Sequence, residues 1–256
     1  MKLKNVISAI MVLLAFGFMS CQEEELNESG PATLDVKLLA MNKSFSLPVN
    51  KSITKSAVAE SPSLSWETVN MVVSEVELEA EMKSMVTDGD SIDIEFIWNG
   101  PQLFDLLDST ISFGNFLLQP GLYDEIELKV EGDDDDAQSG PVFYMSGTYT
   151  NADGVSVPVE MEVFDDLELE TEKERVELNE GNMELISYIH LYLDQLFVGI
   201  TPEQMDNAVL SGGVLVISAQ TNSTIYNKVL DKLTDEHDSE YWHDDDKFDD
   251  DDDDDD

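Results

Sequence analysis

The nine residues Val155-Ser156-Val157-Pro158-Val159-Glu160-Met161-Glu162-Val163 alternate strictly, with apolar residues at every odd position and polar residues or proline at every even one. A strand with one buried and one wet face has this period of two. Asn151-Ala152-Asp153-Gly154 precedes it and residues 142–149 lead in, which predicts a β-hairpin with an Asp-Gly turn. Proline has no amide N–H, so Pro158 is expected at a sheet edge or with its amide position facing solvent.

The same alternation recurs in residues 92–98 and 126–130, where acidic residues are interleaved with apolar ones. Between Val69 and Met82 the apolar positions change from odd to even near Ser74, which predicts a β-bulge there. Glutamates also line one side of two strands, at positions 75, 77, 79 and 81 and at positions 125, 127 and 131. Like charges opposite each other destabilise a sheet, so we expect these rows to avoid each other or to be screened.

Toward the C-terminus the pattern changes to mixed strands and short helices. Residues 185–193 and 213–218 are expected to be strands. Thr201-Pro202-Glu203-Gln204 is typical of a helix N-terminus with a capping box, and predicts a short helix to about Val209. Residues 222–233 have apolar positions at helical spacing, which predicts an amphipathic helix packed on the sheet.

The single cysteine, Cys21, follows Lys2, Lys4 and an apolar run over residues 6–19. This order is typical of a secretory signal peptide, and the apolar run is short for a membrane span. We therefore expect a signal peptide at 1–20, lipidation at Cys21 with a tether at 21–33, a β domain at 34–234 and a disordered tail at 235–256. Two alternatives remain open: an uncleaved anchor helix, or an ordinary signal with a chance cysteine.

Charge restricts the partners. Cleavage before Cys21 leaves 11 basic and 56 acidic residues, a formal charge of −45. Such a chain repels nucleic acid and anionic membrane surfaces, and favours cations or cationic partners. In the tail, 15 of the 22 residues 235–256 are acidic, a composition that predicts disorder.

One central segment resembles a known family. Phe104-Asp105-Leu106-Leu107, a strand at 111–118 and Leu118-Gln119-Pro120-Gly121-Leu122-Tyr123-Asp124-Glu125-Ile126-Glu127-Leu128 resemble a family of exported bacterial lipoproteins catalogued as a domain of unknown function. The resemblance implies a mainly β, antiparallel immunoglobulin-like or transthyretin-like β-sandwich, here with short C-terminal helices. Pro120-Gly121 fits a type II turn with positive φ at Gly121, and Tyr123 is placed to pack over the sheet edge.

The lipoprotein pattern also predicts a location. The glutamates at 23–25, directly after the lipidated cysteine, resemble the surface-export signals of some outer-membrane lipoproteins. We therefore expect a lipid anchor in the outer membrane, with the domain facing the cell exterior.

The sequence contains no Gly-x-Ser-x-Gly, His-Glu-x-x-His or phosphate-binding glycine loop, and its three histidines suggest no catalytic constellation, so we expect no enzyme. Four consecutive acids, Asp133, Asp134, Asp135 and Asp136, lie between two predicted strands. They are either a weak calcium site, with a dissociation constant of about 10⁻⁴ to 10⁻³ M, or a solvated charge run.

Tyr188, His190 and Tyr192 alternate with apolar residues and share one strand face. This face is either packed against the rest of the domain or a platform for a glycan. His237 and His243 in the acidic tail either collect divalent ions loosely or belong to a solubilising tail. We expect a non-enzymatic envelope lipoprotein that is a binding or interaction module; the alternative is a glycan- or peptide-binding accessory lipoprotein.

The lipid anchor leads to a first prediction. Each buried acyl methylene contributes about 0.8 kcal/mol, so a multiply acylated cysteine holds the membrane firmly. Cys21→Ala is expected to release a soluble exported form or to leave an unprocessed precursor, as measured by fractionation and precursor mass. Equal membrane retention with normal processing would contradict lipidation at Cys21.

Overall fold

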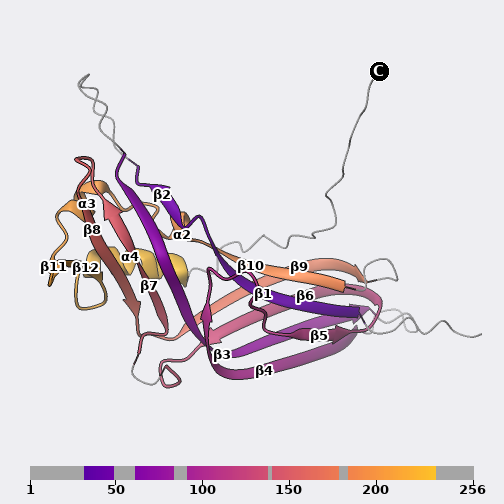
Figure 1. The fold of residues 1–256 in the computed structure, drawn as a ribbon. Coiled ribbons are helices and arrows are strands. Elements are labelled where there is room, and N and C mark those ends of the chain that lie inside the picture. The colour runs from indigo at the N-terminus through magenta and orange to yellow at the C-terminus, as the bar shows by residue number, and fades with distance from the viewer. Residues whose placement is uncertain (1–31, 49–60, 84–90, 138–139, 179–183, 235–256) are drawn as a thin grey trace, which may run out of the picture. The chain divides into compact units, whose positions relative to one another are not determined.

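The computed structural model describes residues 32–48, 61–83, 91–137, 140–178 and 184–234, all of which belong to one unit, 31–256. The predicted signal peptide at 1–20, the predicted lipidation site Cys21 and the acidic tail at 235–256 lie outside the described residues. The described elements are mostly strands (Figure 1). They are β1 (Ala32–Met41), β2 (Ser44–Ser46), β3 (Ser63–Lys83), β4 (Ser91–Asp105), β5 (Asn115–Leu118), β6 (Gly121–Gly132), β7 (Phe143–Thr150), β8 (Ser156–Val163), β9 (Leu167–Leu178), β10 (Glu184–Tyr192), α2 (Leu193–Leu196), α3 (Pro202–Asp206), β11 (Leu210–Ser211), β12 (Val214–Ile217) and α4 (Ser223–Leu233).

The 21-residue strand β3 organises the larger sheet, whose order is β11-β12-β8-β7-β3-β6-β9. Its first half pairs with β7 and its second half with β6. β2 and β4 pair with β3 as well. The strand β3 therefore joins two groups of strands, one paired along its first half and the other along its second half.

The bulge predicted near Ser74 is confirmed. The register of β3 against β4 shifts between Val73 and Glu75, and the buried positions change there from odd to even. Since one extra residue compensates for the change, a single side of β3 stays buried along its length. A second shift, next to Trp66, also changes the phase of β3, whereas the shift next to Met82 places its extra residue, Asp124, on β6.

Both sheets are mixed. The smaller sheet has the order β10-β1-β5, in which β1 pairs with β10 in parallel and with β5 in antiparallel. In the larger sheet β12 pairs with β8 in parallel. The prediction of a mainly β fold is confirmed, but the sheets are not purely antiparallel as expected. Periodicity reports which side of a strand is buried, and it carries no information on the direction of a distant partner.

Aromatic side chains connect the strands through a continuous apolar core. Phe96 on β4 contacts Phe116 on β5, with ring centroids 6.0 Å apart. Phe113, just before β5, contacts Phe104 on β4 at 4.8 Å. These contacts fasten the small sheet to β4 of the large one, and such aromatic pairs stabilise by about 0.5 to 1.5 kcal/mol beyond their buried area.

The predicted hairpin forms from β7 and β8. The Asn151 N–H donates to the Val155 carbonyl at 3.0 Å, and Gly154 takes φ +76°. β8 is not an edge strand, because β12 pairs with it. The pairing with β12 begins at Val159, so Pro158 lies just outside that pairing and is level only with Thr148 on β7.

The C-terminal helices also follow the sequence pattern. Thr201 and Gln204 form the full capping box of α3, which ends at Asp206 rather than Val209. α4 buries one face, and Val229 on that face is fully inaccessible to solvent. The helix α4 contacts β12, which confirms the predicted amphipathic helix on the sheet.

The predicted type II turn at Pro120-Gly121 is wrong. Gly121 begins β6 and is not one of the described glycines with positive φ. Tyr123, by contrast, is fully buried, and its hydroxyl donates to the Gln119 carbonyl at 2.7 Å. This hydrogen bond back to a carbonyl a few residues upstream fixes the corner in the manner of the tyrosine corner of β-sandwiches.

A close approach of β7 to β3 leads to a second prediction. A Cβ on Gly147 would overlap the Ser65 carbonyl oxygen and lie 2.8 Å from Trp66 Cα, and these backbone atoms have little room to move. Gly147→Ala is expected to lower the free energy of unfolding by roughly 1 to 3 kcal/mol, measured by urea denaturation.

Gly121→Ala is the matched control. Its Cβ would meet the Met82 Sδ at 3.0 Å, which is the far end of a flexible side chain. A smaller loss than for Gly147→Ala is therefore expected. Equal losses for the two variants would contradict the close strand approach at Gly147.

Candidate functional site

The most distinctive surface of the described residues is a carboxylate-covered face of four neighbouring strands, which we call the acidic face. Along each strand the acids alternate with buried or half-buried residues, and the strand registers bring the rows together. The acidic face consists of Asp93 and Glu95 on β4, Glu75, Glu77, Glu79 and Glu81 on β3, Glu125, Glu127 and Glu131 on β6, and Glu168, Glu170, Glu172 and Glu174 on β9.

Like charges lie directly opposite each other on this face. Glu79 pairs with Glu127 across β3 and β6, and Glu127 pairs in turn with Glu172 on β9. Of the two expected outcomes, the rows therefore do not avoid each other, and screening of their charges stays a prediction. The register is set by the buried side of the same strands, where Leu78 pairs with Leu128, and a slip of one residue would expose that side.

Lys129 on β6 is a basic residue that lies among the glutamates of the acidic face. It stands opposite Glu77 on β3 and Glu170 on β9. Burial works against its charge, but the surrounding glutamates outweigh burial and raise the pKa of Lys129. Its positive charge thus offsets a small part of the carboxylate charge at the centre of the face.

The central glutamates hold their protons more tightly than free glutamates do. Partial burial, together with the neighbouring carboxylates, raises the pKa of Glu125, Glu127 and Glu131. The causes differ in detail: next after burial comes Glu172 for Glu125, and Glu170 for Glu127. These three carboxylates are consequently ionised against both their burial and the field of their neighbours.

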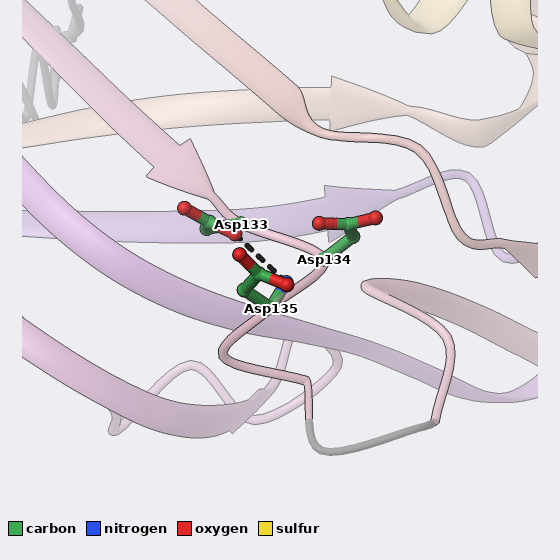
Figure 2. A group of neighbouring side chains, drawn as sticks. All are labelled: Asp133, Asp134 and Asp135. Atoms are coloured by element: carbon green, nitrogen blue, oxygen red, sulfur yellow. Dashed lines mark hydrogen bonds between the residues drawn. The ribbon is translucent and has the colours of Figure 1, made fainter.

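The predicted acidic loop lies where β6 ends. Asp133, Asp134 and Asp135 are exposed, and one carboxylate oxygen of each lies within 4.8 Å of the others (Figure 2). The Asp135 N–H donates to Asp133 Oδ1 at 2.8 Å, as the dashed line in Figure 2 shows. The fourth predicted residue, Asp136, does not join this group.

Asp166, which the sequence did not indicate, is hydrogen-bonded to this loop. Asp166 Oδ1 accepts a hydrogen bond from the Asp134 N–H at 2.9 Å, and its charge is the main cause that raises the pKa of Asp134. Calcium takes about six to eight oxygen ligands, so three carboxylates would need water or backbone oxygens in addition. A calcium site in this loop stays a prediction.

The three aromatic residues of β10 do share one face. The rings of Tyr188 and His190 stack at 5.5 Å, and those of His190 and Tyr192 meet edge to face at 5.9 Å. All three are half-buried, whereas Ser187 and Ile189 on the other side are buried. This row of three rings, which we call the aromatic ladder, therefore lies on the outer side of the small sheet, where Lys37 Nζ is 5.7 Å from the Tyr188 ring centroid.

Two further observations concern membrane spans and relatives. In the part of the chain that the structure describes, every helix is too short or too polar to cross a membrane. The chain matches no family model, no curated protein and no solved structure. The lipoprotein resemblance of residues 104–128 accordingly stays a prediction.

Sequence reasoning identified the rows on β3 and β6 and missed the row on β9. A local signal for the β9 row is nevertheless present in the sequence, because residues 167–174 alternate Leu-Glu-Leu-Glu-Thr-Glu-Lys-Glu. What no local pattern reveals is that β9 pairs with β6 with its glutamates level with theirs.

The raised pKa values lead to a third prediction, on pH. A carboxyl whose pKa is higher in the folded than in the unfolded protein destabilises the fold when ionised, and this effect disappears as the pH falls through the raised pKa. Lowering the pH from 7 to about 5 at low salt is therefore expected to raise the melting temperature. Glu127→Gln is expected to stabilise the protein at pH 7 by roughly 0.2 to 1 kcal/mol per relieved pair, and to weaken this pH dependence.

Asp153→Asn provides the control, since Asp153 is exposed in the β7–β8 turn and lies off the acidic face. It removes the same charge but should leave the pH dependence unchanged. A melting temperature that falls steadily from pH 7 to 5 would contradict the assignment of strain to the acidic face.

Proposed function

We propose that this protein is a non-enzymatic lipoprotein of the cell envelope whose β domain binds a cationic partner through the acidic face. Cys21 would anchor it in the outer membrane, with the domain facing the cell exterior. The observation that supports this proposal best is the acidic face itself, in which glutamates of β3, β6 and β9 lie level with one another.

Distance explains why such a face attracts cations. Neighbouring strands lie about 4.8 Å apart, which is shorter than the Debye length of about 8 Å at physiological ionic strength. The carboxylates therefore act together rather than as separately screened charges. A cationic partner gains from this summed field chiefly in its rate of association and its orientation.

Binding would also relieve a cost that the free protein bears. Each pair of like charges placed opposite across strands costs roughly 0.2 to 1 kcal/mol. A basic partner that lies over Glu79, Glu127 and Glu172 neutralises several such pairs at once. Its binding energy thus includes relief of repulsion within the sheet, besides direct attraction.

The finer fold assignment belongs to the same proposal. We propose that the domain is an immunoglobulin-like or transthyretin-like β-sandwich with added parallel strands. Two contacts support it: the hydrogen bond of Tyr123 to Gln119, and the packing of Phe96 against Phe116 between β4 and β5. The resemblance of residues 104–128 to exported lipoproteins points the same way.

A second candidate function is a glycan- or peptide-binding accessory lipoprotein. The aromatic ladder of Tyr188, His190 and Tyr192 favours it, because aromatic rings in a row on a strand offer a stacking surface. Weak calcium binding at Asp133, Asp134 and Asp135 would be compatible with either function.

The fourth prediction tests the acidic face with decalysine as the probe, measured by calorimetry on the mature full-length chain. Glu79→Lys with Glu172→Lys is expected to weaken binding about tenfold or more, or about 1.4 kcal/mol. Both new lysines face Glu127, so they form favourable cross-strand pairs and the fold is expected to remain stable.

Asp153→Lys with Asp231→Lys is the matched control. Both residues are exposed, on the β7–β8 turn and on α4, and the double change alters the net charge by the same amount. The acidic tail is present in both proteins and contributes equally. If both double variants weaken binding to the same degree, the attraction depends on net charge alone and the acidic face is not the binding site.

A further inference from the structure

A pocket of about 480 Å³ lies on β3 beyond the end of the acidic face. The residues of its lining that matter here are Asn70, Val72, Leu103, Asp136, Tyr144 and Glu162. Its volume falls within the range of about 300 to 1,000 Å³ that is usual for ligand sites. It is therefore large enough for a long side chain together with part of the backbone that bears it.

The bulge at Ser74 puts this pocket on the same side of β3 as the acidic face. Before the bulge the buried residues include Met71 and Val73, which leaves Val72 on the outer side. After the bulge Val76 is buried and Glu75 is on the outer side. A partner that lies along β3 would thus pass from the glutamates directly to the pocket.

Strand pairing fixes the pocket walls. Asn70 on β3 is level with Tyr144 on β7, and Tyr144 is level with Glu162 on β8. Next to this row, Val72 is level with Leu103 on β4. The Val72 N–H donates to the Val142 carbonyl at 2.8 Å, which ties the wall to the start of β7. A polar and aromatic row therefore lies beside an apolar pair.

The chemistry of the lining selects for a cation on an apolar stem. Asp136 and Glu162 supply carboxylates, Tyr144 supplies an aromatic ring, and none of the described residues that line the pocket is basic. A cationic head group is stabilised by carboxylates and by an aromatic face, while its methylene stem packs on apolar side chains. An anionic ligand would meet two carboxylates and no counter-charge.

We propose that this pocket receives one arginine or lysine side chain of the cationic partner, with its stem on Val72 and Leu103 and its charged head between Tyr144 and Glu162. This inference rests on the proposed function and deepens it. The acidic face attracts a basic partner in any register, whereas a pocket for one side chain fixes where along β3 the partner sits.

The fifth prediction tests the pocket with small probes that the acidic face binds poorly. The probes are a pentapeptide whose side chains are uncharged apart from one central arginine, the same peptide with lysine in its place, and the same peptide with citrulline, which has nearly the shape of arginine without its charge. Binding is followed by methyl NMR of the mature full-length chain. The arginine or the lysine peptide is expected to shift the methyl signals of Val72 and Leu103, and to bind about tenfold more tightly than the citrulline peptide.

Variants then locate the interaction. Glu162→Gln and Tyr144→Leu are each expected to reduce the preference for the charged peptide over citrulline several-fold, and to leave decalysine binding within about twofold. Glu170→Gln on the acidic face is the matched control, and should leave the preference intact. Melting temperatures verify that each variant is folded.

The outcomes separate the two proposals. If citrulline binds as well as arginine and lysine, or if the charged peptides shift only methyl signals away from Val72 and Leu103, the pocket does not recognise a basic side chain. That result would not contradict the proposal that the acidic face binds a cationic partner. If decalysine binding is also insensitive to charge reversal on the acidic face, the proposed function fails independently.

Discussion

The pairing of β3 with four other strands is the constraint on which the rest of the domain depends. A strand of 21 residues keeps one side in the core only if its apolar alternation changes phase where its register shifts. The shifts next to Trp66 and at Ser74 correct the phase, so that Val69, Leu78 and their neighbours stay inside. The same corrections keep the outer side continuous, from the pocket to the last glutamate.

The inner and outer sides of this sheet are consequently not independent. Burial of a leucine pair such as Leu78 and Leu128 outweighs the repulsion of one glutamate pair, since full burial of a leucine is worth about 1.5 to 3 kcal/mol and the repulsion roughly 0.2 to 1 kcal/mol. The core thus sets the register, and the carboxylates follow it. An acidic sequence on the outer side becomes an ordered array without any attraction between its members.

Local chemistry predicted the local elements well. The β7–β8 hairpin, the bulge at Ser74, the Thr201 capping box and α4 depend on residues close together in sequence, and all four are present. The failures are of another kind. The parallel partners of β1 and β8, the level glutamates and the role of Asp166 depend on strands far apart in sequence. The predicted positive φ at Gly121 is wrong, and the hydrogen bond of Tyr123 to the Gln119 carbonyl holds that corner instead.

The parallel pairing of β1 with β10 has a consequence for the order of folding. Thr33 is level with Glu184, so the central strand of the small sheet acquires one of its two partners only after some 150 residues have been added to the chain. Closing such a long loop is slow compared with forming a hairpin. While the domain folds, β1 therefore lacks this neighbour, and that edge of β1 stays unpaired until β10 docks.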